Sequence, residues 1–260
     1  MHADIIRSVR FFLAIFAVAA CLAQPASDDI EKLLPPGAKV IESADITGVA
    51  KKPRMLVLWM MRPALLTTPE DAIYCGTYVH GKKTWQGPAR LSLIDPLASV
   101  VINTVRILDA GYNGHAEDRL ELPAFVANDY YYVPRPNSSK EGKPLILNFR
   151  DFTGEGAAAQ FALFIYGACS IVSSSAFGYS VRDGRTMKYQ TEVIENGHRP
   201  TIEEWPEQVF ARKPVRPGYW NFKWRPAHGS DDEIHEVVTF DRTRQRFVDH
   251  RTVKPIPNQR

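Results

Sequence analysis

The chain has 260 residues, of which 45% are hydrophobic and 23% charged, so it is long enough for a substantial core and lacks the composition of a disordered protein. Its formal net charge of +3 excludes strong electrostatic attraction to nucleic acid or to an anionic membrane surface. Nineteen prolines favour many short elements joined by turns.

The N-terminus is typical of a secretory signal peptide. Arg7 and Arg10 precede an uncharged apolar run over 11–23, which is shorter than the about 20 residues that span a bilayer. Two processing routes fit the sequence: ordinary cleavage after residue 23, or a lipoprotein signal over 1–20, because "VAAC" resembles a bacterial lipobox with Cys21 as the lipidated residue. We therefore expect an exported protein, periplasmic, outer-membrane-anchored or extracellular, that meets a membrane only through a lipid.

Two further cysteines, Cys75 and Cys169, remain in the mature chain. In an oxidising compartment they can form a disulfide with only one connectivity. The alternative is that both are buried free thiols, which behave as small apolar residues.

The mature chain, 24–260, is expected to form one mainly-β domain. Residues 27–37 predict a short helix, with Asp28 as its cap and prolines at its end. Residues 39–46 predict a strand, and the continuous apolar run over 55–61 predicts one buried on both faces. The stretch 89–108 indicates two strands joined at Asp95-Pro96.

Hairpins dominate the second half of the sequence. Asp183-Gly184 supplies the turn of one hairpin, after which alternation over 187–193 indicates a single strand with a solvated face. Residues 233–240 and 246–253 predict another hairpin. A second short helix is predicted from Thr201, where Thr201 and Glu204 have the spacing of a capping box.

The fold class is therefore mainly β, with antiparallel sheets and two short helices. A sandwich, an open barrel and a partial propeller all remain compatible with this pattern, and residues 195–200 are the candidate internal boundary.

Residues 148–164, NFRDFTGEGAAAQFALF, have the spacing of a calcium loop. Asp151, Thr153 and Glu155 occupy alternate positions before a glycine, as calcium-binding loops require. The later acidic ligand is replaced by Ala159 or Ala162, according to the loop type. The alternative is a structural turn in which Asp151 accepts backbone N–H groups and the glycines supply backbone freedom.

The stretch 145–166 resembles the turn between strands in FG-GAP/VCBS-type repeats, which are extracellular β modules often built into propellers. The likeness rests on a single copy of RDFTGEG followed by FALF. The resemblance implies a strand–turn–strand unit in which Asp151, Thr153 and Glu155 hold calcium.

A second cluster, HGSDDEIH, offers His228, Asp231 and His235 as zinc ligands. Such a site would make the protein a metal-dependent hydrolase. The alternative is a polar loop with His235 on the solvated face of a strand. The sequence contains no GxSxG, HExxH, CxxC or phosphate-binding motif.

Aromatic residues form the last candidate site. They are Tyr130, Tyr131 and Tyr132 in one run, and Trp220 and Trp224 on one face of a strand. Exposed rings could stack on the sugars of a polysaccharide, whereas period-two spacing favours the alternative, in which the rings form the core face of a strand.

Together these observations favour a non-enzymatic binding or structural module. Its expected partner is a polysaccharide or another envelope protein, and not nucleic acid. The metal-dependent hydrolase and a degenerate calcium-stabilised FG-GAP-like module are the alternatives, and calcium or zinc are the only cofactors that the sequence suggests.

Overall fold

The computed structural model describes residues 27–67, 83–108, 120–123, 146–167, 171–226 and 230–256. Several candidate residues lie outside these ranges: Cys21, Cys75, Tyr130, Tyr131, Tyr132, Cys169 and His228. Over the described residues the protein is mainly β with two short helices, as predicted. Neither helix is long and apolar enough to cross a bilayer.

The described elements follow one another along the chain in this order: α1 (Ser27–Glu31), β1 (Ala38–Asp45), α2 (Thr47–Ala50), β2 (Met55–Met61), β3 (Ala64–Thr67), β4 (Lys83–Gly87), β5 (Ala89–Asp95), β6 (Val100–Arg106), β7 (Leu120–Pro123), β8 (Gln160–Gly167), β9 (Ile171–Ser180), β10 (Arg185–Tyr189), β11 (Thr191–Glu195), β12 (Thr201–Glu203), β13 (Tyr219–Trp224), β14 (Asp232–Asp241) and β15 (Arg246–Pro255).

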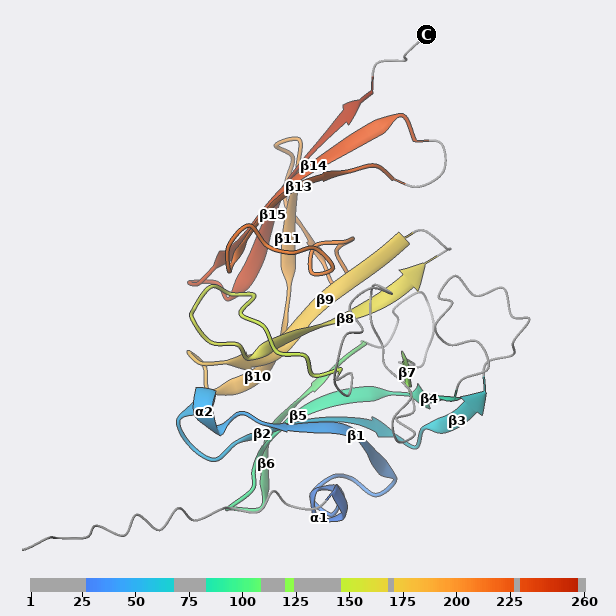
Figure 1. Ribbon diagram of the computed structural model, residues 1–260, viewed down its shortest axis with the longest axis vertical. Coiled ribbons are helices and arrows are strands. Elements are labelled where there is room, and N and C mark those ends of the chain that lie inside the picture. The colour runs from blue at the N-terminus through green and yellow to red at the C-terminus, as the bar shows by residue number, and fades with distance from the viewer. Residues whose placement is uncertain are drawn as a thin grey trace, which may run out of the picture.

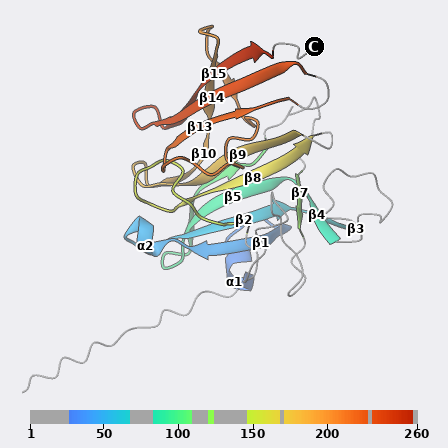
Figure 2. The ribbon, with the colours of Figure 1, turned by 45° about the horizontal axis from the view of Figure 1, so that its top comes forward.

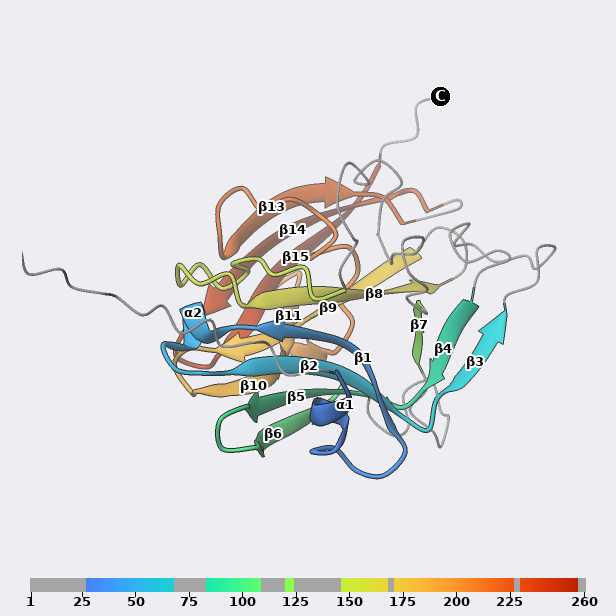
Figure 3. The same ribbon diagram turned by 60° about the horizontal axis from the view of Figure 1, so that its bottom comes forward.

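Three of the four sheets are stacked. The N-terminal sheet has the order β1-β2-β5-β6, the middle sheet β10-β9-β8, and the C-terminal sheet β12-β11-β15-β14-β13. Figures 1 and 2 show the middle sheet lying between the other two, and the small sheet β3-β4-β7 lies to one side (Figure 3). Among the described strands only β11 and β15 pair in parallel, and no sheet closes into a barrel.

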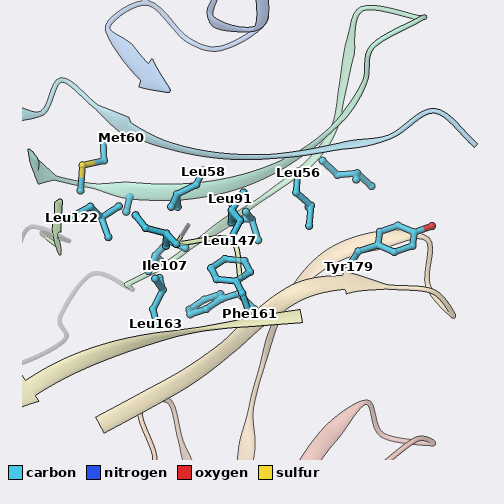
Figure 4. Packing of buried hydrophobic residues seen from close by; sticks show 14 of the residues in the cluster. Leu56, Leu58, Met60, Leu91, Ile107, Leu122, Leu147, Phe161, Leu163 and Tyr179 are labelled. Carbon is cyan, nitrogen blue, oxygen red and sulfur yellow. The ribbon is translucent and has the colours of Figure 1, made fainter. Parts of the chain in front are cut away.

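The first core lies between the N-terminal and middle sheets, as Figure 4 shows. β2, β5, β8 and β9 each direct alternate side chains into it, which is the expected consequence of the two-residue period of a strand. Its central members are Leu56, Leu58, Met60, Leu91, Leu93, Phe161, Leu163 and Phe177. The opposite face of β2 is covered by α1, where Ile30 packs with Val57 and Trp59. The prediction that 55–61 is buried on both faces is thus confirmed.

The second core lies between the middle and C-terminal sheets. It is aromatic: Phe210 packs edge-on against Trp220 and Phe247, with ring centroids 5.7 and 4.8 Å apart. Tyr189 and Val238 complete its centre. The middle sheet contributes side chains to both cores, so each outer sheet packs against it.

The chain passes from the middle to the C-terminal sheet at Gln190. β10 ends at Tyr189, the Gln190 carbonyl accepts the Phe247 N–H at 2.9 Å, and β11 starts at the next residue. The prediction of one strand over 187–193 with a solvated face is therefore wrong, and Glu192 is buried beside Arg244. Residues 196–200 connect β11 to β12, which are neighbours within one sheet.

The second helix does not form where it was predicted. Residues Thr201–Glu203 are the edge strand β12, which pairs with Thr191–Val193 of β11. The capping-box pattern is overridden because the edge of β11 offers these residues ladder hydrogen bonds and Pro206 leaves too little room for a stable helix. The second helix is instead α2, in the β1–β2 connection.

Candidate functional site

The loop 151–156 is held by the carboxylate of Asp151. Its Oδ1 accepts the N–H groups of Gly154 at 2.7 Å and Glu155 at 3.2 Å, and its Oδ2 accepts that of Gly156 at 2.8 Å. Gly154 and Gly156 have φ angles of 71° and 80°. These contacts match the structural-turn alternative, whereas calcium binding by Asp151, Thr153 and Glu155 stays a prediction.

The same loop fastens the middle sheet to the C-terminal sheet. A Cβ at Gly154 would stand 2.7 Å from the carbonyl oxygen of Pro217, and one at Gly218 would stand 2.7 Å from that of Thr153. The Gly154 carbonyl in turn accepts a 2.7 Å hydrogen bond from Arg242. Only glycine permits so close an approach of two backbones.

The segment before this loop is not a regular strand. Residues 146–149 have no ladder, and Arg150 forms only an isolated bridge with Gln160. The expected strand–turn–strand unit therefore lacks its first strand over the described residues 146–149. The backbone N–H groups of Ile146 and Leu147 are instead accepted by Glu42 of β1 at 2.7 and 3.1 Å. Burial raises the pKa of Glu42 to about 7, against the lowering effect of these two hydrogen bonds.

An open groove of about 430 Å³ lies beside the loop. Three connections form it: α2 with Lys51, residues 155–158, and the β9–β10 turn at Val181 and Arg182. Its volume falls within the range of about 300–1,000 Å³ that is usual for ligand sites.

Two of the three walls of the groove are held by hydrogen bonds, and the charge of the lining is mixed. Arg182 Nη1 donates to the carbonyls of Arg242 and Thr243 at 2.5 and 3.0 Å, and Asp151 holds the 155–156 backbone. Lys51 and Arg182 supply positive charge, Glu155 supplies negative charge, and the remaining lining is small or aliphatic.

A buried charged cluster occupies the inner face of the C-terminal sheet. It is centred on Arg251 of β15, whose Nε lies 3.3 Å from Glu236 Oε1 and whose Nη2 lies 3.4 Å from Asp249 Oδ2. Glu203 of β12 lies 3.4 Å from Arg251 Nη1, and Glu195 of β11 lies 3.9 Å away. Both Glu236 and Asp249 are 0% exposed.

The environment of the cluster favours protonated carboxyls. Burial, and then the charge of Asp249, raise the pKa of Glu236 to about 8, although Arg251 acts in the opposite direction. Burial raises the pKa of Asp249 to about 6. At neutral pH the structure therefore favours a proton on Glu236.

Trp220 and Trp224 do not form an exposed aromatic surface. Trp220 is 0% exposed in the second core and donates its Nε1–H to the carbonyl of Arg212 at 3.1 Å. Trp224 is buried too and donates to Glu236 Oε1 at 2.9 Å. The prediction of a binding surface is wrong for these two residues, and the alternative, the core face of a strand, is confirmed because both rings belong to β13 and face inward.

The structure places two of the three predicted zinc ligands. His235 Nε2 lies 2.8 Å from Asn221 Oδ1 on the solvated face of β14, and Asp231 is exposed directly before that strand. In the described part of the chain no three histidine, cysteine or acidic side chains are grouped to hold a metal ion. His228 lies outside that part, so the zinc site stays a prediction.

Sequence reasoning missed the charged cluster, although a signal for it exists. Glu236 is in phase with Ile234 and Val238, so an acidic residue stands on the apolar face of a strand. Asp249, two residues after buried Phe247, repeats that pattern on β15. A comparison of the chain with protein-family models, with curated proteins and with solved structures finds no match.

Proposed function

We propose that the chain is an exported, non-enzymatic binding module whose ligand lies in the groove between α2, residues 155–158 and the β9–β10 turn. The observation that carries this proposal is the groove itself, a preformed hollow whose walls are fastened by Asp151 and Arg182. A pre-organised site loses little conformational entropy when a ligand binds.

The lining favours a short extended segment of a partner protein over a polysaccharide. Among the described residues the lining includes no aromatic ring, and Trp220 and Trp224 are buried, so neither can stack on a sugar. Exposed Val181 and the neighbouring alanines suit an aliphatic side chain, and the Lys51 ammonium suits an acidic one. Such mixed apolar and charged contacts are usual for peptide recognition.

The candidate catalytic groups support an enzyme less well than the groove supports a binding module. Glu236 and Asp249 are 0% exposed, so no substrate reaches them in this conformation. His235 is bonded to Asn221, and Asp151 to the backbone of its own loop.

The test is a selection of peptides from a random display library on the mature chain, followed by calorimetry of the selected sequences. We expect selected peptides that combine aliphatic and acidic residues. Ala158→Arg, which fills the groove from an exposed position, should weaken their binding about tenfold or more. Thr239→Arg is the matched control, because Thr239 is exposed on β14 outside the groove. Equal binding by the Ala158→Arg variant, or no enriched peptide, contradicts the proposal.

A further inference from the structure

Arg251 is surrounded by more negative charge than it can neutralise. Glu236, Asp249, Glu203 and Glu195 approach its guanidinium from four strands, as described above. Glu207, in the segment that follows β12, lies close enough for Arg251 to lower its pKa, although burial raises that pKa more. Trp224 adds one neutral donor from β13.

Two carboxyl oxygens in this cluster accept no hydrogen bond from the described residues: Oε2 of Glu236 and Oδ1 of Asp249. Each belongs to a side chain that is 0% exposed. A buried carboxylate oxygen that has no donor is costly, and the usual relief is to take up a proton. Because solvent does not reach either side chain, the ligand that fits this site is a proton rather than a metal or a small molecule.

We propose that the cluster around Arg251 is a proton-operated clasp, which holds the edge strand β12 on the C-terminal sheet while the Glu236–Asp249 pair carries a proton and releases β12 when that proton is lost. With the proton bound, Arg251 is free to pair with Glu203. Without it, two buried carboxylates compete with Glu203 for the same guanidinium.

Of the strands that contribute to the cluster, β12 is the least firmly attached to the sheet. It has three residues, Thr201–Glu203, which pair with β11 on one side only, and Ile202 is 45% exposed. The ion pair of Glu203 with Arg251 is its side-chain link to the cluster. The chain beyond it is anchored, because Val209 and Phe210 lie in the second core and Ser174 N–H donates to the Pro206 carbonyl at 3.0 Å. Release of β12 therefore admits water to the carboxylates without opening that core.

Asp249, with a pKa of about 6, ionises first, and the remaining proton leaves Glu236, whose pKa of about 8 places the release of β12 near pH 8. Loss of the proton from Glu236 leaves a second negative charge near Asp249. Repulsion between two buried carboxylates is relieved most cheaply by separation or hydration.

The test is amide hydrogen exchange on the full mature chain at about pH 6 and about pH 8.5, corrected for the intrinsic pH dependence of exchange. We expect the protection of 201–203 to fall about tenfold or more at the higher pH, while that of the β14–β15 hairpin stays unchanged. Glu236→Gln, which keeps an acceptor for Trp224 but cannot ionise, should retain protection at both pH values. Glu233→Gln is the matched control on the same strand, and it should behave as the unmodified protein because Glu233 pairs with Lys223 away from the cluster.

Equal protection of β12 at the two pH values in the unmodified protein overturns the proposal, as does a Glu236→Gln variant that still loses it. Carboxyl carbon NMR of the unmodified protein provides a test without any substitution. At least one carboxyl that contacts Arg251 should titrate above about pH 6. If every glutamate and aspartate titrates below that pH, the clasp does not exist.

Discussion

Asp151 and Glu236 are acidic side chains in two parts of the molecule, and they differ in the hydrogen-bond donors that surround them. Asp151 has donors on both oxygens, from Gly154, Glu155 and Gly156. Glu236 has one indole donor on Oε1, no donor on Oε2 among the described residues, and a guanidinium that it shares with Asp249. The difference shows that the role of a carboxyl follows from its donors: the first organises a loop as a carboxylate, and the second is suited to hold a proton.

The largest effect expected from this difference is on the pH dependence of stability. The folded-state pKa is raised for Glu236, Glu42 and Asp249, to about 8, 7 and 6. The folded protein therefore binds more protons than the unfolded chain above about pH 4, so the free energy of unfolding falls as pH rises through about 5–8. Each extra proton contributes a slope of about 1.4 kcal/mol per pH unit. Urea denaturation at several pH values measures this slope. A free energy of unfolding that stays constant or rises with pH contradicts the assigned protonation.

Arg251→Leu should be the most damaging single substitution in the cluster. Removing one partner of a buried ion pair costs about 3–5 kcal/mol, and here it leaves several carboxylates without their cation. The loss should be smaller near pH 5, where Glu236 and Asp249 can be neutral. Arg246→Leu is the control on the same strand, because its partner Glu192 keeps Arg244. Urea denaturation of both variants at two pH values checks this, and a loss for Arg251→Leu that is independent of pH would mean that the carboxyls are already neutral.

Gly154→Ala should cost about 3 kcal/mol, since a left-handed φ and a close backbone act together. Gly156→Ala meets the same left-handed backbone, with a φ of 80°, but its Cβ would have open space around it. It should cost about 1 kcal/mol. Thermal unfolding of the two variants isolates the contact between the Gly154 and Pro217 backbones, and equal losses would show that this contact does not join the sheets.

Exchange of a carboxyl for an amide separates the two roles directly. Asp151→Asn should cost about 1–2 kcal/mol, because the amide has one acceptor oxygen for three backbone donors. Glu236→Gln at about pH 6 should change stability by less than about 0.5 kcal/mol, because a neutral acid is replaced by a neutral amide. Chemical denaturation of both variants at this pH compares them, and the reverse ranking would reverse the roles assigned to the two side chains.

Elements with a local signal could be predicted from the sequence. The signals for the continuous run over 55–61, the Asp183-Gly184 turn and the 233–253 hairpin each lie within a few neighbouring residues, and the structure confirms these elements. β12 could not be predicted, because its three residues are a strand only where β11 offers an edge. The charged cluster depends on register: the pairing of Glu236 with Arg251 and of Val193 with Asp249 brings together residues far apart in the sequence.

Calcium should have the smallest effect, and it tests the feature of the sequence that most suggested a metal. Since the oxygens of Asp151 already accept three backbone N–H groups, a calcium ion would have to displace hydrogen bonds that the folded loop needs. We therefore expect thermal unfolding of the mature protein to coincide, within about 1 °C, in chelator and in calcium up to about millimolar, the range of weak extracellular sites. Asp151→Asn is the control for specificity. A rise of several degrees in the unmodified protein that this variant lacks would correspond to about 2–3 kcal/mol of ligand binding and would show that the loop exchanges its backbone donors for a metal ion.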